Sequence, residues 1–192
     1  MRLFFGILLP AATRDALARE LAARAPLPGR LSLPENWHVT LFFMGEVTAE
    51  RAAEMIAAAR TKRWPTPFLL HTGQLDAFPS VQDARICWLG LMGELSCLLQ
   101  LQREVSDLVQ SFGLEPEARG YSPHVTLSRI KGGSDVQSHL RQPLKSHPFR
   151  VDQLALFQSR PGPHGSSYEV LATFALNAER PRGPGGPAAL VP

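Results

Sequence analysis

The tetrapeptide His-Val-Thr-Leu occurs twice in this chain of 192 residues, at 38–41 and again at 124–127. Because side chains in a β-strand alternate between two faces, the His and Thr of each copy share one face and the Val and Leu share the other. Each copy therefore presents an apolar face to a core and an imidazole with a hydroxyl to some other surface. A single His-x-Thr strand is more often structural than catalytic, but two copies at equivalent places favour a function.

The order of elements around the two copies predicts an internal duplication. A strand, a helix, a loop and a His-x-Thr strand follow one another twice, at 2–9, 13–25 and 37–44 and then at 85–91, 94–112 and 123–130. Duplicated units commonly pack about a pseudo-two-fold axis, which would bring the two polar strand faces together across a groove. We expect an α+β fold with two lobes, two antiparallel sheets around a central groove, and helices packed outside.

Length and composition limit the class of protein. A chain with 44% hydrophobic and 19% charged residues is typical of a soluble globular domain. We expect a single domain over 1–177 and a flexible tail, rich in Pro and Gly, over 178–192. The apolar run at 2–9 matches the strand at 85–91 in the duplication, so we expect it to be a strand and not a targeting signal. No segment is long and apolar enough to span a membrane, and we expect a cytoplasmic monomer.

Metal and cofactor sites have little support in the sequence. Cys87 and Cys97 form no CxxC pair, and the six histidines include no HExxH motif and no His/Cys cluster with zinc spacing. We therefore expect neither a metal nor a cofactor. Surface or structural roles are expected for the histidines outside the two motifs, which are His71, His139, His147 and His164.

The paired motifs suit chemistry at phosphorus. Imidazole has an unperturbed pKa of about 6.5, so one histidine can accept a proton from water while the other, protonated, donates to a leaving oxygen. Thr40 and Thr126 could hold the non-bridging phosphate oxygens, and the guanidinium of Arg129 suits the developing negative charge. Phe43 offers a ring for base stacking, although a position in the core is the commoner outcome for such a residue. Arg129 could equally be a solvated residue at a strand end.

These residues carry a family resemblance. The segments "RLFFGILLP", "HVTLFFMGEV", "RICWLGL", "YSPHVTLSRI" and "LALFQSRPGPHGSSYEVLATFAL" resemble the 2H phosphoesterase superfamily, named for paired H-x-[ST]-x motifs, and within it the RNA 2′,3′-cyclic phosphodiesterases, also called 2′-5′ RNA ligases. The resemblance implies that His38 is the proton donor and His124 the proton acceptor. It also implies that Thr40 and Thr126 bind phosphate, that Arg129 matches the arginine after the second motif, and that hydrolysis needs no metal or nucleotide cofactor.

The expected function is hydrolysis of the 2′,3′-cyclic phosphate at an RNA 3′ end to a 2′-phosphomonoester, with tRNA fragments among the candidate substrates. Two alternatives stay within enzymes: 2′-5′ ligation of RNA in the reverse direction, and action on another small cyclic phosphate. A third alternative belongs to another class, a module that binds RNA or a nucleotide without turnover. The intact pair of histidines argues against that last alternative, because a pure binder needs no acid and base together.

Overall fold

The computed structural model describes residues 1–115, 120–162 and 165–177. The predicted flexible tail at 178–192 and His164 lie outside these described residues. The chain forms an α+β fold, as expected from the sequence. The strands are β1 (Arg2–Leu8), β2 (Arg30–Leu31), β3 (His38–Glu46), β4 (Phe68–Phe78), β5 (Ala84–Gly93), β6 (His124–Ser134), β7 (Pro148–Val151), β8 (Gln153–Gly162) and β9 (Gly165–Ala175). The helices are α1 (Ala11–Ala22), α2 (Ala49–Thr61), α3 (Leu95–Gln110) and α4 (Gln137–Leu140), with a 3-10 turn at Pro34–Asn36.

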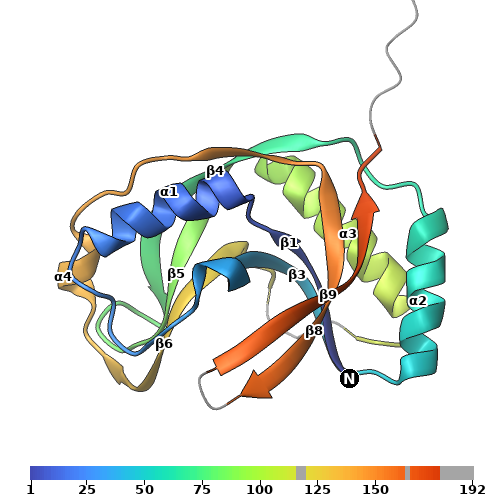
Figure 1. The fold of residues 1–192 in the computed structure, drawn as a ribbon, viewed down its shortest axis with the longest axis horizontal. Coiled ribbons are helices and arrows are strands. Elements are labelled where there is room, and N and C mark those ends of the chain that lie inside the picture. Colours follow the sequence, from blue (N-terminus) through green and yellow to red (C-terminus); the bar gives the residue numbers. More distant parts are fainter. Residues whose placement is uncertain (116–119, 163–164, 178–192) are drawn as a thin grey trace, which may run out of the picture.

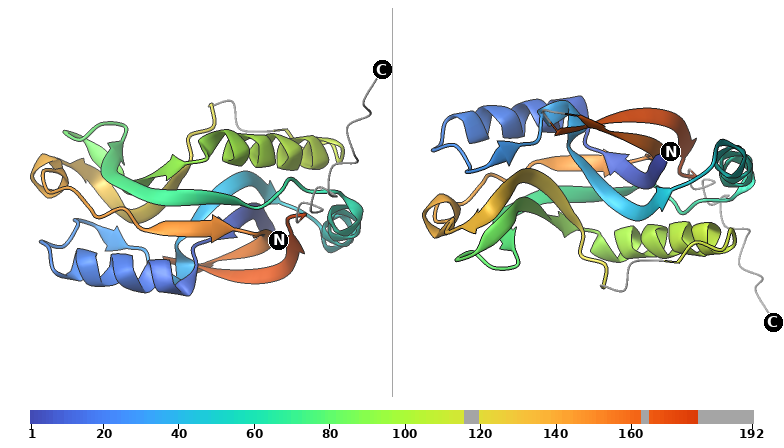
Figure 2. Two further views of the ribbon diagram at one scale, coloured as in Figure 1. Left: turned by 90° about the horizontal axis from the view of Figure 1, so that it is seen from above. Right: turned by 90° about the horizontal axis from the view of Figure 1, so that it is seen from below.

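The strands form one antiparallel sheet in the order β7-β4-β5-β6-β3-β1-β8-β9, and β2 pairs with the edge of β6. Its two halves meet where β3 lies beside β6, and a single residue pair, Val39 opposite Val125, joins them. The two sheets expected from the sequence are therefore the two halves of one continuous, curled sheet (Figure 1). Seen from above and below, α1 and α3 lie on opposite sides of the strands and α2 lies at one end (Figure 2).

The two repeats exchange strands. β4 follows the first motif strand in the chain but pairs with β5 of the second repeat, and β8 follows the second motif strand but pairs with β1 of the first. Each half of the sheet therefore contains strands from both repeats. Neither half can form from one repeat alone, so the junction of β3 with β6 depends on strands from both repeats.

Helices α2 and α3 pack against strands of this sheet. α2 begins after Thr48, whose Oγ1 accepts a hydrogen bond from the backbone N–H of Arg51 at 3.3 Å. α3 packs against β3 through side chains spaced three or four residues apart, namely Leu98, Leu101, Val105 and Val109. α1 starts at Ala11 and ends at Ala22, so the sequence-based range of 13–25 is displaced toward the C-terminus. None of the helices among the described residues is long and apolar enough to cross a membrane.

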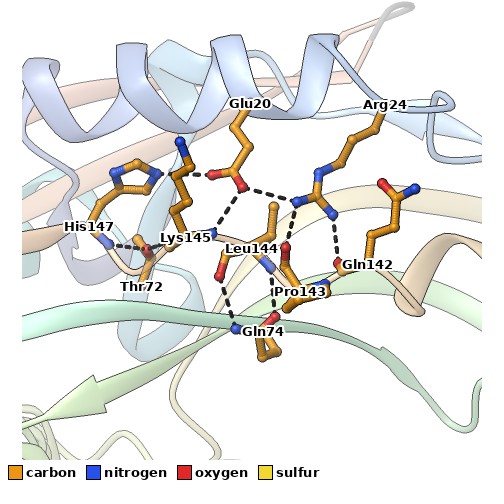
Figure 3. Close-up of polar contacts among 9 residues, drawn as sticks. All are labelled: Glu20, Arg24, Thr72, Gln74, Gln142, Pro143, Leu144, Lys145 and His147. Atoms are coloured by element: carbon orange, nitrogen blue, oxygen red, sulfur yellow. Dashed lines mark hydrogen bonds and ion pairs between the residues drawn. The ribbon is translucent and has the colours of Figure 1, made fainter.

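Polar contacts fasten α1 to the segment between α4 and β7 (Figure 3). Glu20 Oε1 accepts hydrogen bonds from Arg24 at 3.0 Å and from the backbone N–H of Lys145 at 2.9 Å, and its Oε2 lies 3.1 Å from His147 Nε2. Arg24 also donates to the carbonyl oxygen of Gln142 at 2.6 Å. Burial alone would raise the pKa of the Glu20 carboxyl, but the hydrogen bonds from Lys145, His147 and Arg24 together lower it. The structural role expected for His147 fits this position.

Candidate active site

The first motif strand, β3, contains a one-residue bulge at the leucine of its motif. Thr40 pairs with Gly6 of β1 and Phe42 pairs with Phe5, so Leu41 between them has no partner across the strand. A bulge of one residue reverses the alternation of side chains beyond it. As a result the residue after Phe42, and not Phe42 itself, returns to the face that carries Thr40.

The second motif strand, β6, contains the same bulge at the equivalent position. Thr126 pairs with Trp88 of β5 and Ser128 pairs with Cys87, which leaves Leu127 unpaired. The backbone carbonyl of Leu127 instead accepts a hydrogen bond from the N–H of Ser32 at 2.8 Å, so the short strand β2 lies alongside this irregularity.

The two bulges bring Phe43 and Arg129 onto the same faces as the motif histidines. The two residues are structurally equivalent, because each stands five positions after its histidine. Strict alternation would have put Phe42 and Ser128 there, but Phe42 is buried in the core and Ser128 is fully buried beside Cys87. Phe43 is half-buried and Arg129 is exposed.

The pairing of β3 with β6 brings the polar residues of both motifs together. The central valines of the two motifs are directly opposite. Continuing the antiparallel register by one residue each way sets His38 opposite Thr126 and Thr40 opposite His124. All four side chains lie on the face away from the buried valines and leucines, so the structure places the four predicted motif residues side by side.

Each histidine is oriented by a hydrogen bond to a backbone carbonyl two residues earlier. His38 Nδ1 lies 2.6 Å from the carbonyl oxygen of Asn36, and His124 Nδ1 lies 2.8 Å from that of Ser122. A carbonyl can only accept, so these bonds assign the proton of each neutral imidazole to Nδ1. Nε2 of both rings is then left with a lone pair for proton transfer.

His38 is held among aromatic rings. Its ring centroid lies 4.7 Å from Phe4 and 4.8 Å from Tyr168, which meets it edge-on at 78°. Phe4 stacks in turn on Phe157 at 4.8 Å. Gly6 makes room for this stack, since a Cβ there would lie 3.3 Å from Phe4 Cε2 and 3.5 Å from Phe157 Cε2.

His124 has an equivalent setting in the other half of the sheet. Phe78 and Trp88 stack on each other at 4.8 Å and present their edges to the imidazole at 5.4 and 5.8 Å. The aromatic residues around both histidines were not predicted from the sequence. They come from strands far apart in the chain, so no local spacing marks them.

The pKa values of both histidines lie below the ordinary imidazole value. The pKa of His38 is lowered to about 4, mainly by burial; the charges of His124 and Arg129 act in the same direction, and the hydrogen bond to Asn36 opposes them. Burial also lowers the pKa of His124, with Arg129 acting in the same direction and the bond to Ser122 opposing it. The neutral form of each ring is therefore favoured more strongly than in a free imidazole, whose pKa of about 6.5 was the starting point of the sequence argument.

A cleft of about 920 Å³ opens beside these residues. Its walls include Thr40, Phe43, Tyr121, His124 and Arg129. His38 and Thr126, both among the described residues, do not line it. Within the described part of the chain, no group of three or more His, Cys, Asp or Glu side chains could hold a metal ion.

Comparison with known proteins places this arrangement in a family. The model of the 2′-5′ RNA ligase superfamily matches residues 10–163. An RNA 2′,3′-cyclic phosphodiesterase of Escherichia coli is 33% identical over 176 residues, covering 91% of this chain and 96% of its own length. Another of that description, from Aeropyrum pernix, is 36% identical over 126 residues, covering 64% of this chain and 69% of its own length.

Solved structures agree with the sequence comparison. The crystal structure of E. coli LigT complexed with 3′-AMP superimposes with a TM-score of 0.78 at 29% identity, covering 91% of this chain and 97% of that one. The family model spans most of the sequence and includes both motif strands. The chain belongs to the 2′-5′ RNA ligase superfamily, a family of 2H phosphoesterases.

Proposed function

We propose that this protein hydrolyses the 2′,3′-cyclic phosphodiester at the 3′ end of RNA to a 2′-phosphomonoester, with His38 and His124 as the acid and the base. The observation that carries the proposal is the pair of histidines on one face of adjoining strands, each with Nδ1 bound to a carbonyl and with no hydrogen bond at Nε2 from the described residues. The names of the relatives, RNA 2′,3′-cyclic phosphodiesterase, support the choice of substrate. The 3′-AMP in the E. coli structure supports binding of a nucleotide phosphate.

The proposed reaction needs one proton at each side of phosphorus. Neutral His124 takes a proton from water through Nε2, and the resulting hydroxide forms a bond to phosphorus. The bond from phosphorus to O3′ breaks, and protonated His38 gives its Nε2 proton to that oxygen. The hydroxyls of Thr40 and Thr126 donate to the non-bridging oxygens, and Arg129 stabilises the charge that builds on them. The 2′ oxygen keeps the phosphate.

The low pKa of His38 in the free protein sets a condition on this mechanism. At pH 7 a group with a pKa of about 4 is protonated in roughly one molecule in a thousand. A bound phosphodiester anion favours the charged imidazole and raises its pKa. Binding of the substrate therefore favours protonation of His38, because the anion offsets the repulsion that His124 and Arg129 exert on the charged imidazole.

This condition predicts the pH dependence of turnover. A bell-shaped profile is expected, because one histidine must be neutral and the other protonated. The profile of kcat/KM reports the free enzyme and should be centred below 6.5, whereas the profile of kcat reports the complex and should lie at higher pH. The limbs belong to the pair and not to either histidine alone. Superimposable profiles would contradict the role of the bound anion.

The direct test is incubation with an oligonucleotide that ends in a 2′,3′-cyclic phosphate, in the presence of EDTA, with identification of the product phosphate position. We expect a 2′-phosphate and no effect of the chelator. His38→Ala and His124→Ala should each reduce turnover by about 10²–10⁴-fold, and the double variant should be little slower than either. His139→Ala, which removes an imidazole from α4, is the matched control. A 3′-phosphate product, loss of activity with EDTA, or fully multiplicative losses would each contradict the proposal.

A further inference from the structure

We propose that the cleft accepts the end of an RNA chain and not merely a mononucleotide, and that Arg2 and Phe43 bind the nucleotide preceding the one with the cyclic phosphate. This inference rests on the proposed function. It assigns a role to two residues that the acid–base chemistry does not use, although both line the same cleft as His124.

Arg2 lies away from the motif residues that would bind the reacting phosphate. On β1, Gly6 is the partner of Thr40, and Arg2 is four residues from Gly6, which is roughly 13 Å at the rise of a strand. Phe43 lies between them on the same face, because its partner on β1 is Phe4. The guanidinium of Arg2 lies over the Phe43 ring, 5.4 Å from the centroid.

The charge of Arg2 is available to a ligand. Glu46 is opposite Arg2 in the ladder, but its carboxylate pairs with the N-terminal amine of Met1 at 3.1 Å. Among the described residues no carboxylate lies within ion-pair distance of Arg2. The described residues that line the cleft include Arg2, Arg85 and Arg129 but no Asp or Glu. A cleft whose described walls carry several cations and no carboxylate is suited to a ligand with more than one phosphate.

The pairing of Arg2 with Phe43 is also suited to a nucleotide in particular. Single-stranded RNA is bound through phosphate contacts together with stacking of bases on aromatic rings or guanidinium planes. A guanidinium held over a phenyl ring offers both, since its N–H groups reach a phosphodiester while its plane presents a flat surface to a base. The cleft volume of about 920 Å³ lies near the upper end of the range for small-molecule sites, roughly 300–1,000 Å³.

The antiparallel strands give this subsite a direction. Beyond Thr40, β3 runs alongside the residues that precede His124, so Arg2 and Phe43 lie at the His124 end of the motif pair. Arg85 lies at the other end, because its neighbour Ile86 pairs with Arg129. An RNA 3′ end continues on one side only. Arg85 is within 3.8 Å of the Asp83 carboxylate and has no aromatic partner among the described residues, so we place the chain at the Arg2 end.

The test compares two substrates that share the reacting nucleotide: adenosine 2′,3′-cyclic phosphate and a trinucleotide ending in the same group. The wild-type protein should prefer the trinucleotide in kcat/KM by about tenfold or more at low salt, and the preference should fall as salt is raised. In Arg2→Gln the ratio of the two kcat/KM values should approach one, and the salt dependence for the trinucleotide should weaken by about one unit of slope. Phe43→Leu should lower the ratio of kcat/KM for the trinucleotide to that for the mononucleotide, without changing the salt dependence for the trinucleotide.

Arg150→Gln is the matched control, since it removes the same charge from the exposed face of β7, and it should keep the wild-type ratio. Equal kcat/KM values for both substrates in the wild-type protein would overturn the inference. The inference would also be overturned if Arg85→Gln lost the preference for the trinucleotide and Arg2→Gln kept it. If neither substrate is turned over, the proposed function fails, and the inference is decided by affinity for a trinucleotide 3′-phosphate relative to 3′-AMP. Arg2→Gln should then weaken binding of the trinucleotide 3′-phosphate and leave binding of 3′-AMP unchanged. An equal effect on both affinities would overturn the inference.

Discussion

Replacing His38 by Gln should change how the stability of this protein depends on pH. The folded-state pKa of His38 is about 4, mainly because of burial, whereas the unfolded chain has the ordinary value of 6.5. Between these values the unfolded state binds a proton that the folded state does not. Stability due to the neutral ring is therefore fully present above pH 6.5 and is lost as the pH falls toward 4.

The size of the effect follows from the two pKa values. Relative to pH 7.5, the wild-type protein should lose roughly 2 kcal/mol by pH 5 and roughly 3 kcal/mol by pH 4 through this one histidine. The glutamine side chain of His38→Gln does not titrate, so the variant lacks this loss. It keeps every other titrating group, including His124. The difference between the two curves of unfolding free energy against pH therefore reports the titration of His38 together with its coupling to His124.

Urea unfolding at pH 7.5, 6, 5 and 4.5, followed by circular dichroism, measures the difference directly. The free energy of unfolding of His38→Gln should rise relative to wild type at each step toward acid, whichever protein is more stable at pH 7.5. His139→Gln, a substitution in α4, is the control for the effect of removing an imidazole from elsewhere in the protein on the free energy of unfolding. A difference between His38→Gln and wild type that stays constant from pH 7.5 to 4.5 would refute the argument, because it would mean that His38 titrates alike in the folded and unfolded states.

Three further substitutions test other parts of the structure. Arg129→Ala should slow turnover about 10²-fold while the melting temperature barely moves, because the side chain is exposed; a large fall in melting temperature would favour a structural role. Gly6→Ala should destabilise the protein by about 1–3 kcal/mol in urea unfolding, since a Cβ would lie 2.8 Å from the Val39 carbonyl oxygen. In Gly120→Ala the added Cβ meets none of the described residues within 4 Å, so this variant should be nearly neutral. Glu20→Gln should cost about 1–3 kcal/mol at pH 7, and its difference from wild type should shrink as the pH falls below about 4.5, because protonation then removes the carboxylate from the wild type as well.

The sequence predicted the parts of this fold that depend on local pattern. The duplicated order of elements, the two motif strands and the helix near 95–110 all follow from apolar periodicity and from turn residues. The start of α1 differs by two residues because Pro10 fits the position before a first helical turn. The exchange of β4 and β8 between the repeats was not predicted. Pairing partners in a sheet are chosen by tertiary packing, which local composition does not reveal.

The side chains that face the cleft after each histidine could not be predicted from strand alternation. Period-two alternation from His38 leads to Phe42, and from His124 it leads to Ser128, yet the structure presents Phe43 and Arg129. Alternation alone excludes both residues. Phe43 was predicted because its ring could stack on a base, and Arg129 because of its charge and the family resemblance.

The bulges at the two motif leucines reconcile these observations. They occur at equivalent positions in both repeats and each is supported by pairing on the neighbouring strand. A bulge lets one strand bury its Val and Leu and still turn a residue five positions after the histidine toward the same cleft. The duplication therefore repeats a backbone irregularity as well as a tetrapeptide. Because the two copies differ at that redirected position, a ring in one half and a cation in the other, a symmetric scaffold yields a cleft with two distinct ends.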